Sequence, residues 1–388
     1  MTDVAVQRWL PAIYLESKSR MPTPRLVTRR GFLKLASSAL ALTALPQLPL
    51  PPDDLTVRPE HHPDQVSASA LPKLPLPPED LAARPEHRLG RVTTWHAWLH
   101  SEPHREAPHV GERRYDDIVN ILEEVEGVGE YDHNPIWYRI LDGYIYSSWV
   151  QPVDYRFNRP IRWVESPGML AWVTVPYTDV RARPDPSLQR TYRLYYDAIF
   201  RVIDVHVADE KPRQVWYGLR EGLTWDGVYW AKAEHLRIIP PQELTPLSPQ
   251  VEDKRILIEL GKQWLTCFEG RNEVFNTRIS SGMPGMMTPL GTHRVLQKIP
   301  TTRMIGGEGE GRYDLPGIGF TTYFTRKGVA IHGTYWHNDY GNRRSHGCVN
   351  VPTTAAQWIY RWTRPDAPYD KQRVFAGEND ATDIEVVL

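Results

Sequence analysis

A proline-rich repeat near the N-terminus limits which part of this 388-residue chain can fold. The segment from Leu48 to His61 recurs almost unchanged from Leu74 to His87, at an offset of 26 residues. Proline fixes φ and lacks a backbone donor, so such a repeat forms an extended, semi-rigid spacer and buries no core. We therefore expect residues 46–90 to be a linker, with folded domains beginning near residue 91. A ligand for a proline-recognising partner would have the same composition.

The residues ahead of this linker resemble an export signal. The pair Arg29-Arg30 is followed by Phe-Leu-Lys, and a run of small and apolar residues continues to Ala44. This pattern is similar to a twin-arginine signal, which implies export of the folded protein to the cell envelope, on the periplasmic or extracytoplasmic side. Gly31 to Leu45 comprises fifteen residues, fewer than the about 20 that span a bilayer. We therefore assign residues 1–45 to a twin-arginine signal region.

Charge and cysteine content exclude several classes of function. The formal net charge is −1, with 24% of residues charged, whereas nucleic-acid binders carry a marked basic excess. We therefore expect no nucleic-acid partner. The two cysteines, Cys267 and Cys348, give no sign of a disulfide framework. We predict two free thiols.

Two segments in the middle of the chain share a pattern of short strands rich in aromatic residues. The first, 91–160, closes with Ile136 to Val153, in which Asp142-Gly143 marks a turn. The second, 165–245, ends with Val228 to Ile239. The tryptophan and glycine positions and the proline-closed ends resemble bacterial SH3-like modules. That resemblance implies two small SH3-like β-barrels that serve as accessory or substrate-binding domains, with most of their tryptophans packed in cores.

A new pattern of predicted strands begins after residue 251. Lys254 to Leu260 and Gln263 to Glu269 predict a β-hairpin, and Glu273 to Ser281 predicts a third strand. Thr353 is expected to cap a short helix that ends before Pro365. We therefore assign residues 252–388 to one further domain, and the fold of the whole chain to the mostly β class.

A glycine run, Gly306 to Gly311, has only a superficial likeness to a phosphate-binding loop. No lysine or Ser/Thr closes it in the P-loop pattern, and no helix pattern follows. We therefore expect a loop beside the cleft and no nucleotide partner.

The residues that can carry chemistry gather between Ile331 and Pro352. Cys348 ends the sequence Ser-His-Gly-Cys, and the pair His332-Gly333 lies sixteen residues before it. A cysteine needs a neighbouring base to become a thiolate near neutral pH, and an imidazole can be that base. Gly347 has no Cβ, so backbone N–H groups there can turn toward a reacting carbonyl and form an oxyanion hole. Cys348 and His332 are therefore the candidate catalytic pair.

Two other interpretations of this stretch use the same residues. A lone cysteine often packs as a small hydrophobe, as we expect for the mid-strand Cys267, but the neighbours of Cys348 are polar. A metal site is the second rival, but the spacings here lack the close ligand pairs of structural zinc sites. Its ligands would come from His332, His337, Asp339, His346 and Cys348. We expect no metal and no cofactor.

The order of these motifs resembles the signature of the L,D-transpeptidase catalytic domain, also called the YkuD-type domain. The His-Gly pair, a gap of about a dozen residues and Ser-His-Gly-Cys-x-Asn follow a segment, Thr288 to Val295, that is similar to the family's Thr-Pro-x-Gly segment. The resemblance implies a β-sandwich with a short helix, in which Cys348 is the nucleophile and His332 the base. It also implies supporting roles for the neighbouring residues. Gly333 would orient His332, His346 and Gly347 would serve the oxyanion, and Ser345 and Asn350 would support the loop or contact substrate.

The same resemblance implies a peptidoglycan L,D-transpeptidase acting in cell-wall biogenesis and cell shape. Cys348 would attack a stem tetrapeptide, release D-alanine and pass the acyl group to an amine, which forms a 3→3 cross-link or attaches another amine to the wall. The expected partners are peptidoglycan stem peptides, with carbapenem-type β-lactams as covalent inhibitors. The alternatives are an L,D-carboxypeptidase or cysteine peptidase that uses water, and a wall-binding protein with a dead site, which the intact pair argues against.

Overall fold

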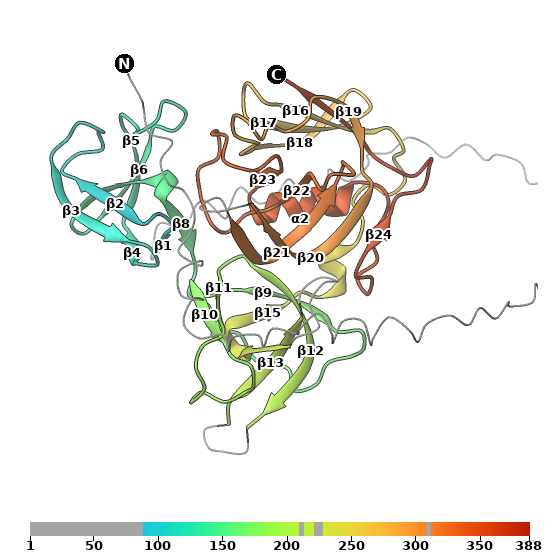
Figure 1. Ribbon diagram of the computed structural model, residues 1–388, viewed down its shortest axis with the longest axis horizontal. Helices are drawn as coiled ribbons and strands as arrows, with labels where there is room; N and C mark the ends of the chain where they lie inside the picture. Colours follow the sequence, from blue (N-terminus) through green and yellow to red (C-terminus); the bar gives the residue numbers. More distant parts are fainter. Residues whose placement is uncertain (1–87, 209–212, 221–227, 308–311) are drawn as a thin grey trace, which may run out of the picture. The chain divides into compact units, whose positions relative to one another are not determined.

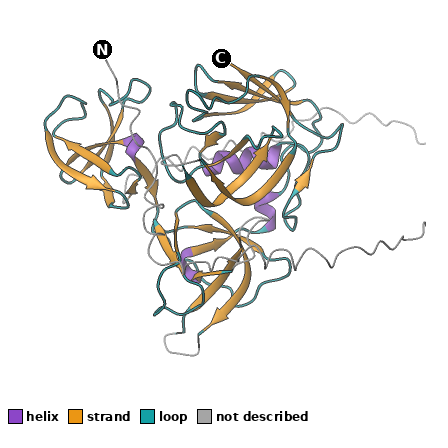
Figure 2. Ribbon diagram, viewed as in Figure 1, coloured by secondary structure: helices purple, strands orange, loops and turns teal. Residues whose placement is uncertain are grey.

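Strands dominate the structure, a computed structural model that describes residues 88–208, 213–220, 228–307 and 312–388. A single α-helix lies among these residues, and strands, drawn orange in Figure 2, far outnumber helices, so the expected mostly β class is confirmed. The predicted signal region and nearly all of the predicted linker lie outside the described residues, as does the glycine run from residue 308 to 311. No described helix is both long enough and apolar enough to cross a membrane.

The first group of strands, β1 to β8, covers residues 88–153 (Figure 1). It forms a three-stranded sheet of order β4-β1-β8 and a five-stranded sheet of order β3-β2-β7-β6-β5, around a core that includes Trp137 and Ile145. The expected turn at Asp142-Gly143 joins β6 to β7, and Gly143 adopts φ +145°, which glycine tolerates. The strands are β1 (Arg88–Val92), β2 (His96–His100), β3 (His109–Arg114), β4 (Ile118–Ile121), β5 (Glu123–Glu126), β6 (Ile136–Ile140), β7 (Gly143–Tyr146) and β8 (Val150–Val153).

The second group of strands, β9 to β15, has a two-stranded sheet, β10-β11, and a five-stranded sheet of order β14-β13-β12-β9-β15. Its buried aromatic residues include Phe200, Tyr217 and Tyr229. The strands are β9 (Met169–Val173), β10 (Tyr177–Val180), β11 (Tyr192–Tyr195), β12 (Ile199–Val207), β13 (Val215–Arg220), β14 (Tyr229–Lys232) and β15 (Leu236–Ile238).

The two groups share a pattern of strand pairing. In each, the first strand lies between the last and the fourth, since β1 pairs with β8 and β4, and β9 pairs with β15 and β12. A single 3-10 turn precedes the last strand in each group, η4 (Ser147–Trp149) in one and η5 (Ala233–His235) in the other. The similarity of the two sequence segments thus corresponds to a similar order of pairing.

The C-terminal residues form two five-stranded sheets, β18-β17-β16-β25-β19 and β23-β22-β21-β20-β24. The expected hairpin is β16–β17, in which Ile256 pairs with Cys267, and the expected third strand is β18. β20 continues through Gly306, so the first glycine of the predicted loop lies in a strand. The elements are η6 (Pro241–Leu244), β16 (Lys254–Glu259), β17 (Trp264–Glu269), β18 (Asn272–Arg278), β19 (Gly291–Arg294), β20 (Gln297–Gly306), β21 (Tyr313–Tyr323), β22 (Ala330–Gly333), β23 (Val349–Val351), α2 (Thr353–Trp362), β24 (Val374–Phe375) and β25 (Asp383–Val387).

Helix α2 packs against β21 and β22, but Thr353 does not cap it as expected. Pro352 is the N-cap, Thr353 is the first helical residue, and no side-chain cap bond forms. The Thr353 side chain is buried instead against β22, where a Cβ added to Gly333 would lie 2.8 Å from its Oγ1. Only glycine at position 333 therefore lets the helix approach this strand so closely.

The second group of strands shares a hydrophobic core with the C-terminal sheets. Leu170 and Ile199 belong to the same buried cluster as residues of both sheets and of α2. β12 meets β21 where β21 carries glycine. A Cβ added to Gly317 would lie 2.4 Å from the Phe200 ring, and one on Gly319 would lie 2.5 Å from Ile199.

We expect Gly317→Ala to lower the free energy of unfolding by about 2–4 kcal/mol. The substitution has two costs, because the added methyl group overpacks the core and because alanine has to adopt a left-handed backbone at φ +70°. Gly285 is a matched control. It adopts φ +86° with no atom within 4 Å of an added Cβ, so Gly285→Ala carries only the backbone cost, about 1–2 kcal/mol. Denaturant unfolding measures both, and equal losses would contradict the close packing of β12 on β21.

Candidate active site

The structure brings the two predicted catalytic residues to one pocket. β22 and β23 are parallel neighbours in which His332 pairs with Asn350, and Cys348 immediately precedes β23. Both His332 and Cys348 line a pocket of about 180 Å³. Two adjacent strand ends thus place an imidazole and a thiol on the same cavity.

A backbone carbonyl fixes the tautomer of His332. The ring is buried, and its Nδ1 lies 3.0 Å from the Gly333 carbonyl oxygen. A carbonyl only accepts hydrogen bonds, so Nδ1 carries the proton and Nε2 keeps its lone pair. Burial lowers the pKa of His332 to about 4, against the opposing effect of the Gly333 bond. At neutral pH the ring is therefore an uncharged base, with Gly333 in the orienting position expected from the sequence.

The Cys348 thiol is protonated at rest. Burial raises its pKa to about 11, although the backbone N–H of Ala330 acts in the opposite direction. Its Sγ lies 3.8 Å from the Gly328 carbonyl oxygen, which a thiol can use as an acceptor. The resting pair is thus a neutral thiol and a neutral imidazole that line the same pocket. Any attack by Cys348 has to be accompanied by proton transfer.

The turn before Cys348 is closed by hydrogen bonds of its own. The Ser345 hydroxyl donates to the Cys348 carbonyl at 2.5 Å and accepts from the Gly347 N–H at 3.0 Å, which places Ser345 as the predicted loop support. Gly347 adopts φ +120°, a left-handed conformation that favours glycine. Because the Gly347 N–H is engaged within the turn, the geometry differs from the oxyanion role expected for it.

His346 lines the same pocket but lacks an orienting bond. Its half-buried ring packs 4.9 Å from the Tyr313 ring, and burial lowers its pKa. Over the described part of the chain, no hydrogen bond holds either ring nitrogen. His346 therefore lines the cavity as an aromatic wall, whereas a hydrogen bond to the Gly333 carbonyl orients the His332 ring.

The rest of the pocket combines apolar and charged surfaces. Met304, Leu315 and Ile318 form an apolar wall, and Lys327 and Arg344 bring two cationic side chains. Such a lining accommodates a ligand with an apolar body and an anionic group.

One family model matches the C-terminal part of the chain. Residues 253–374 match YkuD, the L,D-transpeptidase catalytic domain. This domain contains His332, Cys348 and every residue that lines their pocket. Residues 88–245 lie outside the match.

Solved structures of L,D-transpeptidases show similarity to parts of the chain. An L,D-transpeptidase from Mycobacterium smegmatis is 17% identical, over 48% of this chain and 100% of that one, with a TM-score of 0.29. A mutant of the Enterococcus faecium L,D-transpeptidase is 24% identical, over 36% of this chain and 51% of that one, also with a TM-score of 0.29. The matched region thus spans about half of the E. faecium protein. No curated protein matches the sequence.

His337, within the matched residues, makes contacts that the sequence did not predict. Its Nδ1 accepts from the Asp339 N–H at 3.2 Å, and its Nε2 lies 3.0 Å from the Asn350 side-chain amide. Burial lowers the pKa of His337 to about 3, so the ring is neutral and Nε2 carries its one proton. Since amide oxygen and nitrogen are assigned from their partners, Asn350 presents its oxygen here. Asn350 therefore has a supporting contact beside His332.

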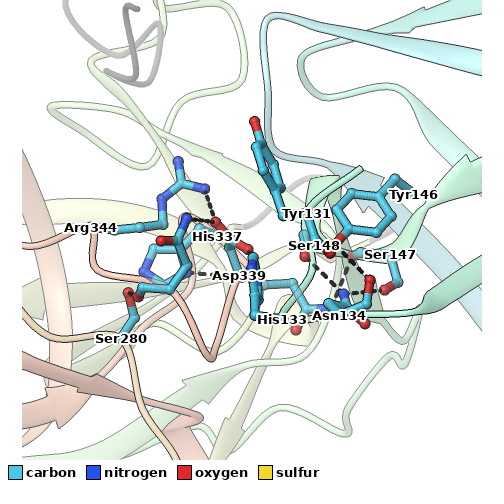
Figure 3. Close-up of polar contacts among 12 residues, drawn as sticks. Tyr131, His133, Asn134, Tyr146, Ser147, Ser148, Ser280, His337, Asp339 and Arg344 are labelled. Carbon is cyan, nitrogen blue, oxygen red and sulfur yellow. Dashed lines mark hydrogen bonds and ion pairs between the residues drawn. The ribbon is translucent and has the colours of Figure 1, made fainter. Parts of the chain in front are cut away.

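Asp339 is a second feature that the sequence did not reveal. The carboxylate is buried, yet it contacts His133 at 2.7 Å and Arg344 at 2.9 Å (Figure 3). Burial alone raises the pKa of Asp339, but the hydrogen bond from His133 and the charge of Arg344 bring it well below the usual range. The ionised Asp339 carboxylate therefore contributes its full share to the free energy of unfolding above the ordinary carboxyl pKa of the unfolded chain. This contribution is lost as the pH falls through the lower pKa of Asp339 in the folded chain.

No group of three or more His, Cys, Asp or Glu side chains in the described ranges is placed to hold a metal ion. His337 and Asp339, two of the ligands in the metal interpretation, contact Asn350, His133 and Arg344 instead.

Proposed function

We propose that the chain is a peptidoglycan L,D-transpeptidase that works through a cysteine acyl-enzyme. The observation that supports it most is the pairing of Cys348 with His332, whose tautomer Gly333 fixes, in one pocket of the matched domain. A free Nε2 on the same cavity as a thiol is the arrangement that general-base activation of a nucleophile needs.

In the acylation step, Cys348 Sγ attacks the carbonyl carbon of the L-centre of the stem diamino acid, and His332 Nε2 takes the thiol proton. The bond to the terminal D-alanine breaks, His332 returns the proton to the departing amine, and a thioester is left on Cys348. Backbone N–H groups of His346 and Cys348 would stabilise the oxyanion, where losing one donor typically costs about 3–4 kcal/mol in the barrier.

In the transfer step, an acceptor amine attacks the thioester carbonyl while His332 Nε2 removes the proton from that amine. The new amide forms, the carbon–sulfur bond breaks, and the thiol recovers its proton from His332. An acceptor from a neighbouring stem gives a 3→3 cross-link, whereas water gives only the shortened stem. Lys327 and Arg344 in the pocket lining would favour a stem peptide that carries carboxylates.

The decisive experiment is incubation of the chain with a purified stem tetrapeptide, followed by mass spectrometry. We expect loss of D-alanine, a thioester on Cys348 and a cross-linked dimer, with Cys348→Ala as the inactive control. Shortened stem without dimer, even with added amine, would favour the carboxypeptidase instead. No D-alanine loss and no adduct would reject the proposal.

We expect the pH profile of acylation to follow His332. Its neutral form acts as the base, and its pKa is lowered to about 4. Acylation should therefore run at its full rate well above that pH and slow down as His332 becomes protonated. Stopped-flow fluorescence with a carbapenem-type β-lactam, a proposed covalent inhibitor, measures this rate. Circular dichroism at each pH checks that the chain is still folded. A fall already centred near pH 6.5 would contradict the lowered pKa.

We propose that the folded chain works in the cell envelope after export through the twin-arginine signal, with the SH3-like modules as accessory domains. The paired arginines and the short apolar run that follows them support the route. Replacing Arg29 and Arg30 by lysine should leave the protein in the cytoplasm. Cell fractionation measures this, and unchanged export would point to another pathway.

A further inference from the structure

The loop between the two catalytic residues, 334–344, has no regular structure of its own. We name it the connecting loop. It begins directly after β22, which carries His332, and it ends at Arg344, four residues before Cys348. Since His332 lies in β22 just before this loop and Cys348 follows the loop just before β23, the conformation of the loop influences how the thiol and the imidazole face each other.

Asp339 fixes the connecting loop from within. Its Oδ2 accepts from Arg344 Nη1 at 2.9 Å and from Asn342 Nδ2 at 3.1 Å. Arg344 itself lines the catalytic pocket. The backbone N–H of Asp339 donates to His337, whose other ring nitrogen lies against Asn350 in the strand beside His332. Asp339 is thus joined to both sides of the site.

The first group of strands supplies the remaining partner of this carboxylate. His133, in the turn between β5 and β6, brings Nε2 to 2.7 Å from Asp339 Oδ1, and its side chain is 18% exposed (Figure 3). The two residues are 206 positions apart in the sequence. A hydrogen bond to a buried, ionised acceptor is among the stronger ones in a protein.

Two further bonds from the first group of strands reach the same loop. Arg91 in β1, which is fully buried, donates from Nη2 to the Tyr335 carbonyl at 2.7 Å. Asn338 donates from Nδ2 to the Ser147 carbonyl at 3.1 Å. Three residues of the connecting loop are therefore held by residues that lie outside the matched range 253–374. They are Tyr335, Asn338 and Asp339.

We propose that the first group of strands is a working part of the active site and that His133 is a positioning residue for Cys348 and His332. Its hydrogen bond holds the Asp339 carboxylate, and Asp339 in turn holds Arg344 and His337. The consequence for catalysis rests on the proposed transpeptidase function, whereas the hold on the loop does not. The first group of strands thereby has a role beyond that of a tethered accessory module.

The test compares His133→Ala, His133→Gln and His96→Ala in the full chain. Glutamine keeps an N–H donor for Asp339. His96 is the matched control, because it pairs with Glu112 at 2.6 Å within the same group of strands, and no hydrogen bond or ion pair between described residues joins its side chain to the loop. We expect His133→Ala to lower kcat for D-alanine release by about 10- to 100-fold with little change in KM, as misplacement of reacting groups does. We expect glutamine to restore most of the rate and His96→Ala to keep all of it.

A substrate-free measurement separates this inference from the proposed function. Amide hydrogen exchange over residues 334–344 should be faster in His133→Ala than in the parent, and unchanged in His96→Ala. If the parent releases no D-alanine, the proposed function fails, and the exchange result still decides whether His133 holds the loop. Parental exchange and parental kcat in His133→Ala would overturn the inference. Equal impairment by alanine and glutamine would overturn it too, because the hydrogen bond would then not be the cause.

Discussion

Cys348→Ser is expected to lower D-alanine release from a stem tetrapeptide by about 10⁴-fold or more, as removal of a catalytic nucleophile commonly does. The reason lies in the resting state of the pair. The thiol is neutral with a pKa of about 11, and His332 is a weak base because burial lowers its pKa to about 4. A serine hydroxyl is a far weaker acid than a thiol, so the same imidazole cannot activate it to a comparable extent.

Cys267→Ser is the matched control for this result. Cys267 is the other free thiol, fully buried in β17, and burial raises its pKa well above the usual value. We expect Cys267→Ser to keep the parental rate and to lose about 1–3 kcal/mol of stability through the buried hydroxyl. Mass spectrometry of carbapenem adducts should place the label on Cys348 alone. A label on Cys267, or full activity of Cys348→Ser, would remove Cys348 from its proposed role.

The part of the site that the sequence could predict is formed by residues that lie close together in the chain. Gly333 follows His332 directly, and its carbonyl bonds the same ring. Ser345 and Cys348 close one turn by a bond across three residues. These contacts depend on short stretches of chain, so residue types and spacing carry enough information to place them. The hairpin of β16 and β17 was predictable for the same reason.

The supports of the site were not predictable, because they join distant segments. His133 and Asp339 are 206 residues apart, and Arg91 and Tyr335 are 244 apart. Neither His133 nor Asp339 lies in a motif that marks it as a partner of the other. The shared core of the second group of strands and the C-terminal sheets was likewise missed, since the glycine of β21 that admits Phe200 has no local signature.

Local hydrogen bonding explains one difference within the motif itself. Gly347 was expected to donate its N–H to an oxyanion, but the Ser345 hydroxyl two residues away accepts that N–H at 3.0 Å. Serine side chains often compete in this way for nearby backbone groups. Burial disfavours the charged forms of both Cys348 and His332, so the resting pair is uncharged at neutral pH.

His332→Gln is expected to lower the acylation rate of Cys348 by about 10²- to 10⁴-fold, which is the range that a general base contributes. His332 lies in β22, which is buried throughout, and its Nδ1 is bonded to the Gly333 carbonyl, which leaves Nε2 for the pocket that Cys348 also lines. Glutamine is nearly as large as histidine and cannot act as a base at neutral pH. A folded His332→Gln variant therefore isolates the loss of proton transfer from the loss of packing.

His346→Gln separates the two imidazoles that line the pocket. His346 packs on Tyr313, and within the described ranges no hydrogen bond orients its ring. Its replacement should therefore change the acylation rate by about tenfold at most, as expected for a contact outside the proton transfer. The pH profile decides between the residues. In His346→Gln the fall of the rate near pH 4 should persist, because the pKa of His332 is about 4, whereas in His332→Gln it should disappear. If His332→Gln keeps the parental rate and profile while His346→Gln loses both, His346 is the base and the Gly333 bond has only a structural role.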